Sequence, residues 1–281
     1  MVQFSPLGVT VNEAKRWLVI GPLQFQPSEL AKPAIVLYFA TLFSKSCVIL
    51  DSKKYPFYFI FAFMLLLIYK QPNLSMIILL LVTSVAMYYV AGGSMKMILG
   101  AGGAGILAVA VTIRDYQMQR IRVWWNPFSD ALGAGYNIIQ SLVAFSSGGL
   151  FGVGFGNSKQ KLSWLPEGHT DFIYAVWGEE FGFLGCLLII GLFLAFLQRG
   201  LLISAKCDDL FGKLLAAGIT VSICIQAYIN IAVSSSMIPA TGVPMPFISY
   251  GGTSLFITMC MIGILLNISK KKVRRFPINV Q

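Results

Sequence analysis

Long runs of apolar residues follow one another along the chain, separated by short polar or basic segments. They cover about residues 30–50, 55–69, 74–91, 97–113, 172–197, 214–233 and 247–268. A helix needs roughly 20 apolar residues to cross the hydrocarbon core of a bilayer, where it satisfies its own backbone hydrogen bonds. The pattern therefore predicts an all-α fold, a polytopic transmembrane helical bundle with about seven spans, of which 55–69 is short.

The composition agrees with a protein that is surrounded by lipid. Hydrophobic residues make up 57% of the 281 residues and charged residues only 11%, against about 25% charged residues in a soluble domain. The five cysteines form no CxxC pair, and Cys186, Cys224 and Cys260 lie inside apolar runs. These observations exclude an ordinary soluble globule, a disordered chain and a disulfide scaffold.

The basic residues predict how the chain is oriented. The net charge is +10, but no basic domain with interleaved aromatic residues lies outside the apolar runs, so a nucleic-acid partner is not expected. Basic residues lie instead in short connections and in a run after the last apolar segment: Lys45, Lys53, Lys54, Lys96, Arg199, Lys206, Lys213 and positions 270–275. The positive-inside rule then predicts a multi-pass protein of the cell (inner) membrane with a cytoplasmic C-terminus. Anionic membrane lipids are the expected partners of the terminal basic run.

The segment 114–170 is the longest polar stretch and is predicted to be one large external loop. It contains a glycine run, from Gly148 to Gly156, that lacks the Lys-Ser/Thr of a P-loop. These glycines either allow backbone bends or let the backbone approach a lipid pyrophosphate. The basic residues Arg120, Arg122, Lys159 and Lys161 are either solvated loop charges or contacts for an anionic substrate.

Asp171 is the acidic residue that stands where this loop meets the next apolar run. A carboxylate at a membrane boundary is costly unless it is paired or used. Either Thr170 or Asp171 caps the helix that starts here, or Asp171 acts as a general base toward a lipid headgroup. The single histidine of the chain, His169, cannot build a histidine-based metal site, so no structural metal is expected.

Two polar pairs and one irregular segment complete the candidate chemistry. Glu29 and Lys32 are three residues apart, so they either neutralise one another or line a polar groove. Gln226 and Asn230 are four apart in an apolar run, which is typical of hydrogen bonding between helices. The segment 238–252 is rich in Pro and Gly, and such backbone at membrane depth must be buried in protein or line a polar cavity.

Three stretches of the chain resemble the SEDS family (shape, elongation, division and sporulation), to which FtsW, RodA and SpoVE belong. They are Arg16-Trp17-Leu18 with Gln26-Pro27-Ser28-Glu29-Leu30-Ala31-Lys32, the stretch 165–173 (LPEGHTDFI) with 178–182 (GEEFG), and the stretch 244–252 (PMPFISYGG). The resemblance covers nearly the whole chain and is closest to the FtsW branch. It implies one SEDS-type transmembrane domain over 1–281, of ten spans in the family, from which the first three are expected to be absent here.

The resemblance also implies an activity and the residues that carry it. The family polymerises lipid II into glycan strands at the outer membrane face, beside a class B penicillin-binding protein. Asp171 matches the family's essential aspartate, and Glu29 and Lys32 match its acid–base pair. Arg120, Arg122, Lys159, Lys161 and His169 are further candidates for binding the substrate, whose leaving pyrophosphate would be neutralised by basic groups or a divalent cation (Mg or Mn). A lipid II flippase and an inactive scaffold for a penicillin-binding protein are the alternatives.

Overall fold

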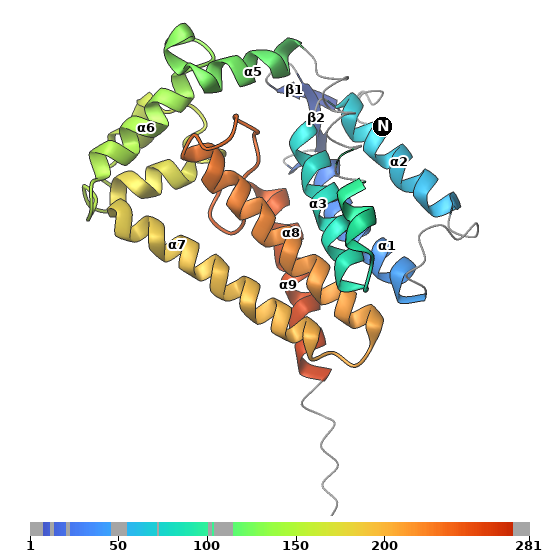
Figure 1. Cartoon of the computed structure of the whole chain (residues 1–281). Coiled ribbons are helices and arrows are strands. Elements are labelled where there is room, and N and C mark those ends of the chain that lie inside the picture. Colours follow the sequence, from blue (N-terminus) through green and yellow to red (C-terminus); the bar gives the residue numbers. More distant parts are fainter. Residues whose placement is uncertain are drawn as a thin grey trace, which may run out of the picture. The chain divides into compact units, whose positions relative to one another are not determined.

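The computed structural model describes residues 8–11, 14–20, 23–45, 55–71, 73–100, 103 and 115–271. It is mainly helical, which confirms the predicted class of fold (Figure 1). The elements are β1 (Gly8–Val11), β2 (Ala14–Ile20), β3 (Leu23–Phe25), α1 (Pro27–Lys45), α2 (Tyr55–Lys70), α3 (Leu74–Val90), α5 (Asp115–Trp125), η3 (Pro127–Asp130), α6 (Tyr136–Gly148), η4 (Gln160–Trp164), α7 (Ile173–Ala205), α8 (Leu210–Ser234) and α9 (Gly252–Lys271).

The chain divides into two compact units. The first comprises Met1–Met95, Phe196–Ile225 and Gly252–Gln281, and the second comprises Lys96–Ala195 and Gln226–Gly251. Helices α7 and α8 therefore contribute residues to both units. That all 281 residues form one domain stays a prediction.

Three described helices are long and apolar enough to cross a membrane, namely α7, α8 and residues 252–270 of α9. Helices α2 and α3 are shorter apolar helices, as their sequence runs predicted. The run 97–113 lies mostly outside the described residues, so the count of seven spans stays a prediction. Of the most apolar 18-residue stretch of each helix, 78% is buried inside the protein in α8, but only 28% in α7 and in α9. Helices α7 and α9 thus retain broad apolar surfaces that suit contact with lipid.

Several helix boundaries differ from the ends of the predicted runs. Helix α7 ends at Ala205 instead of 197, and α8 begins at Leu210 instead of 214. Helix α1 begins at Pro27 instead of about residue 30, because proline is tolerated in the first turn, where its missing N–H would have no helical partner. Helix α9 begins at Gly252 instead of 247. Phe247 has a left-handed φ of 69°, and the Ser249 N–H is bound to the carbonyl of Met245 in a turn that ends before the helix.

A small antiparallel sheet precedes α1, and the sequence analysis did not predict it. Strand β2 pairs with β1 on one side and with β3 on the other, with Leu18 opposite both Gly8 and Phe25. The strands have four, seven and three residues. Segments this short show too few alternations of apolar and polar residues to be separated from irregular chain.

The first unit is packed around α1. Phe39 and Phe43 stack with ring centroids 5.2 Å apart, and Phe43 lies 5.7 Å from the ring of Tyr88 on α3. A Cβ at Gly218 on α8 would come within 2.7 Å of the side chains of both Val36 and Met87. A glycine is needed at this position because α8 approaches α1 and α3 more closely than any side chain would allow.

The predicted loop 114–170 is largely helical. Helices α5 and α6 have 11 and 13 residues, which is too short to cross a bilayer. That the region forms one external loop stays a prediction. Asn126 precedes η3, whose first residue Pro127 fits the start of a helix. The sequence analysis predicted a loop here and did not predict these helices.

The glycine run fits against a break in α7. Helix α7 is interrupted at Gly182, where φ is 67° and ψ is −166°. The carbonyls of Glu179 and Glu180 accept the N–H groups of Val153 and Gly154 at 3.0 and 3.1 Å. The N–H groups of Phe183 and Leu184 donate to the carbonyls of Gly149 and Leu150 at 2.8 and 3.2 Å. The segment 149–154 thus supplies the partners that the break removes from α7.

The sequence analysis left open whether these glycines allow backbone bends or approach a lipid pyrophosphate. At Gly152 the structure shows which role the glycine has. A Cβ at Gly152 would lie closer than 3.0 Å to the carbonyl oxygen of Glu180, and its φ of +82° is left-handed. Gly152 therefore serves the close approach of two backbones. The same approach involves Gly182, whose added Cβ would come closer than 3.0 Å to the backbone of Leu150 and Gly152.

Candidate functional site around Asp171

Asp171 lies in a tight turn, two residues before α7 begins at Ile173. The carbonyl of Glu167 accepts the N–H groups of Thr170, Asp171 and Phe172 at 3.1, 3.1 and 3.2 Å. Glu167 itself has a left-handed φ of 57°, which bends the chain so that its carbonyl faces all three donors. The Thr170 hydroxyl donates to the Glu167 carboxylate at 2.6 Å and to its carbonyl at 3.1 Å, so it serves this turn.

The Pro/Gly-rich segment after α8 is joined to this turn by hydrogen bonds. Asn230 Nδ2 donates to the carbonyls of Asp171 and Val243, each at 2.8 Å. The Ser249 hydroxyl donates to the carbonyl of Thr170 at 2.5 Å, and the Tyr250 N–H donates to the carbonyl of His169 at 2.8 Å. The stretches 165–173 and 244–252, about 80 residues apart in sequence, therefore form one local structure.

The Asp171 carboxylate lies beside the backbone of Gly242. Its Oδ2 would be 3.4 Å from a Cβ added at Gly242, whose φ is +69°. Asp171 is half-buried, so its carboxylate is partly accessible while its backbone is held. A half-buried carboxylate on a fixed backbone can accept a proton from a hydroxyl that reaches hydrogen-bonding distance.

The amide side chains of Gln226 and Asn230 on α8 bind backbone carbonyls. Gln226 Nε2 donates to the carbonyl of Pro244 at 2.8 Å, one residue beyond the Val243 carbonyl that Asn230 holds. These contacts join α8 to the segment 243–244, and hydrogen bonding of the two amides between helices stays a prediction. Proline-rich chain cannot satisfy its own carbonyls in a regular ladder, and the amide side chains supply the missing donors.

The predicted basic residues separate into two groups. Arg120 is exposed and its Nη1 donates to the carbonyl of Ala240 at 2.9 Å, two residues from Gly242. His169 is exposed and is bound through its carbonyl to Tyr250, on the same segment. Arg122 is exposed on α5. Hydrogen bonds thus link Arg120 and His169, with Asp171, to the segment 240–250.

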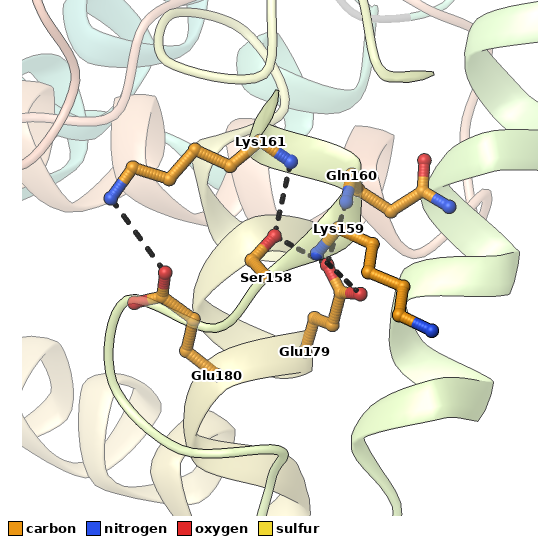
Figure 2. A network of polar contacts seen from close by, with 6 residues as sticks. All are labelled: Ser158, Lys159, Gln160, Lys161, Glu179 and Glu180. Carbon is orange, nitrogen blue, oxygen red and sulfur yellow. Dashed lines mark hydrogen bonds and ion pairs between the residues drawn. The ribbon is translucent and has the colours of Figure 1, made fainter. Parts of the chain in front are cut away.

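Lys159 and Lys161 belong to a second polar network, which surrounds two buried glutamates of α7 (Figure 2). The Glu179 carboxylate accepts the Ser158 hydroxyl and the N–H groups of Lys159 and Gln160, the latter two at 3.2 and 3.3 Å. Lys161 Nζ lies 3.7 Å from Glu180 Oε1. In Figure 2 the Lys159 ammonium points away from both carboxylates, so its charge remains available on the surface.

The sequence analysis missed the role of Glu179. It named the stretch 178–182 only as part of the family resemblance, whereas the structure shows a helix that breaks two residues after Glu180. A carboxylate at the start of the π-helical turn η4 satisfies N–H groups that lack helical partners. The Gly-Glu-Glu-x-Gly spacing, directly before a break, was the available signal.

Glu29 and Lys32 form a buried ion pair at the start of α1, in the first unit. Lys32 Nζ lies 2.6 Å from Glu29 Oε2, and the two side chains are only 2% and 3% exposed. The predicted pairing of these residues is present. They lie inside the protein, however, rather than at an exposed helix end, because α1 starts three residues earlier than the apolar run.

Exchanging the two charges of this pair should restore part of the folded protein that is lost when only one of the two residues is changed. Removing one partner of a buried ion pair leaves an uncompensated charge and costs about 3–5 kcal/mol. We expect Glu29→Lys and Lys32→Glu each to lower the amount of folded protein in membranes strongly, and the double exchange to recover a substantial part. The measurement is monodisperse protein by size exclusion; a double variant no better than the worse single one would contradict the pairing.

Comparison with known proteins identifies the family. The family model of the FtsW, RodA and SpoVE proteins, described as cell cycle proteins, matches residues 1–274. The chain belongs to this family. The resemblance that the motifs around Glu29, Asp171 and Ser249 indicated is therefore confirmed.

Individual members of the FtsW/RodA/SpoVE family match along most of the chain. A probable peptidoglycan glycosyltransferase FtsW of Geobacter sp. (strain M18) is 37% identical over 277 residues, which cover 96% of this chain and 76% of that protein. Stage V sporulation protein E of Bacillus subtilis (strain 168) is 38% identical over 276 residues, covering 96% and 75%.

Solved structures of this family resemble the fold. A chain of a peptidoglycan synthase complex, described as coordinating polymerization and crosslinking, superposes with a TM-score of 0.77 at 27% identity, covering 96% of this chain and 77% of that one. The rod shape determining protein RodA of Thermus thermophilus superposes with a TM-score of 0.67 at 27% identity, covering 96% and 73%.

Proposed function

We propose that this chain is a peptidoglycan glycosyltransferase that joins lipid II units into glycan strands at the outer face of the cell membrane. The observation that carries the proposal is the half-buried Asp171 carboxylate on a turn whose backbone is held at both sides. Relatives that match 96% of the chain are named probable peptidoglycan glycosyltransferases, which supports the assignment of the reaction.

In this proposal Asp171 is the general base. A hydroxyl of the acceptor sugar attacks the anomeric carbon of the donor, and the bond between that carbon and the pyrophosphate oxygen breaks with inversion. The hydroxyl proton passes to the Asp171 carboxylate, and polyprenyl pyrophosphate leaves with the electron pair. A positioned base of this kind contributes about 10²–10⁴-fold to the rate.

Basic side chains near the site neutralise the leaving group in this proposal. Arg120 is joined to the segment 240–250, and Arg122, Lys159, Lys161 and His169 add exposed donors. Among the residues with described positions, no three His, Cys, Asp or Glu side chains gather as metal ligands. A divalent cation (Mg²⁺ or Mn²⁺) would therefore take most of its ligands from the substrate's phosphates.

A partner that crosslinks the product fits the same proposal. The similar complex of known structure coordinates polymerization with crosslinking, and a class B penicillin-binding protein is the partner that the family resemblance implies. In this proposal the chain polymerises lipid II into a glycan strand, and the penicillin-binding protein then crosslinks that strand.

Labelled lipid II tests this function directly. The full-length protein, in vesicles with its partner, should convert lipid II into glycan chains that gel electrophoresis resolves. Exchange of lipid II between leaflets without formation of glycan chains would instead support the flippase. The absence of both activities would support the inactive scaffold.

The proposed orientation places residues 114–170 outside and the C-terminus inside. In a cysteine-free background, an impermeant maleimide applied to intact cells should label Ser129→Cys, which is exposed between α5 and α6. It should leave Lys206→Cys, exposed between α7 and α8, unlabelled until the cells are opened. These two positions are a matched pair, because both are exposed in short connections. Labelling of position 206 but not 129 from outside would reverse the orientation.

A further inference from the structure

Hydrogen bonds hold the backbone carbonyls of residues 169–171 and the N–H of Asp171. The carbonyls of His169, Thr170 and Asp171 accept hydrogen bonds from the Tyr250 N–H, the Ser249 hydroxyl and Asn230 Nδ2. The Asp171 N–H donates to the carbonyl of Glu167 at 3.1 Å. Both backbone groups of Asp171 are thus occupied, so the place of its carboxylate depends on these partners.

Asn230 is suited to hold two chain segments at once. It is fully buried, and its single Nδ2 group donates to the carbonyls of Asp171 and Val243. Both partners are acceptors, so only a group with two donors fits between them. Val243 follows Gly242, the residue against which Asp171 Oδ2 lies. Asn230 therefore fixes the distance between the carboxylate-bearing turn and the backbone beside it.

Ser249 makes the second link by donating and accepting together. Its hydroxyl accepts the N–H of Met245 at 2.7 Å and donates to the carbonyl of Thr170 at 2.5 Å. The turn 245–249, which contains Pro246, is thereby closed onto the residue before Asp171. Loss of the hydroxyl removes both contacts with little change in volume.

We propose that Asn230 and Ser249 are positioning residues that hold the Asp171 carboxylate beside Gly242 in the geometry needed for proton transfer. The inference rests on the proposed function, in which Asp171 is the base. Proton transfer requires heavy atoms about 2.6–3.2 Å apart, and a misplacement of 1 Å can lower a rate by about 10²-fold. Neither side chain needs to touch the substrate for this effect.

The test compares kcat and KM for lipid II in two variants of the full-length protein with its partner. Asn230→Asp keeps the shape but replaces the donor with an oxygen that faces two carbonyls, and Ser249→Ala removes the hydroxyl. We expect kcat to fall by about 10–10²-fold in each while KM stays within about threefold. Ser249→Thr, which restores a hydroxyl, should recover most of kcat.

A matched control separates positioning from general stability. Ser141→Ala removes a buried hydroxyl that donates to the Ser234 carbonyl at 2.5 Å, an acceptor outside the segments 165–173 and 240–250. It should keep kcat within a few-fold of the parent. A kcat in Ser249→Ala as high as in Ser141→Ala would overturn the proposal.

A second readout works whether or not the chain polymerises lipid II. In a background without the cysteines at 47, 186, 207, 224 and 260, Asp171→Cys reports the position of residue 171 through its rate of reaction with a water-soluble maleimide. Adding Ser249→Ala should change this rate at least threefold, and adding Ser141→Ala should not. Equal rates would refute the positioning role, whereas a changed rate with an inactive parent would refute only the polymerase function.

Discussion

Asp171→Asn should reduce lipid II polymerisation by about 10²–10⁴-fold while the protein folds and accumulates as the parent does. Asparagine has nearly the same shape, and the backbone bonds of residue 171 to Glu167 and Asn230 do not involve its side chain. The amide cannot accept the proton of the attacking hydroxyl. Measurement requires the initial rate of glycan-chain formation and, in the same preparation, the thermal unfolding midpoint.

Asp130→Asn is the matched control for this change. Asp130 is also an acid of the region 114–170, and its Oδ2 accepts the N–H of Ala134 at 2.9 Å, as an amide oxygen also can. Its replacement should leave polymerisation unchanged. If Asp171 only capped α7, asparagine would serve about as well. Polymerisation by Asp171→Asn within a few-fold of the parent would therefore return Asp171 to that role.

Among the Gly→Ala substitutions in the segment 149–156, Gly152→Ala should lower the free energy of unfolding most. Its Cβ would lie closer than 3.0 Å to the Glu180 carbonyl, at a φ of +82°. The left-handed conformation alone costs an L-residue about 1–2 kcal/mol, and the collision would push the segment away from the break in α7. We expect little monodisperse protein and a strongly lowered unfolding midpoint.

Gly156→Ala isolates the collision from the conformational cost. Gly156 has nearly the same φ, +81°, but an added Cβ would meet no atom within 4 Å. This variant should lose only the cost of the left-handed conformation and remain well folded. Equal losses in the two variants would mean that the contact between Gly152 and Glu180 does not hold the segment in place.

Local sequence signals predicted the start of α7 and the acid that precedes it, because a polar turn before a long apolar run marks both features. Asn73 lies between the predicted runs 55–69 and 74–91, and its side chain caps α3 by accepting the N–H of Met76 at 3.2 Å. The buried pair of Glu29 and Lys32 followed from their spacing. Each of these features depends on residues within four positions of one another.

Features that join distant segments could not be predicted in the same way. The spacing of Gln226 and Asn230 places both on one helix face, but it does not reveal that their partners are backbone carbonyls. The glycine run gave no sign of which atoms it approaches. Gly152 faces Glu180, 28 positions away, and only the break at Gly182 explains why that carbonyl needs a new donor.

The break in α7 also constrains how the chain enters the membrane during synthesis. Inserted alone, α7 would carry unpaired backbone groups near Gly182, and each such group costs several kcal/mol in lipid. Their partners, in the segment 149–154, precede α7 in the chain and leave the ribosome first. This order of synthesis lets the segment and the helix dock as a pair, so that a bilayer never has to accept the broken helix unaccompanied.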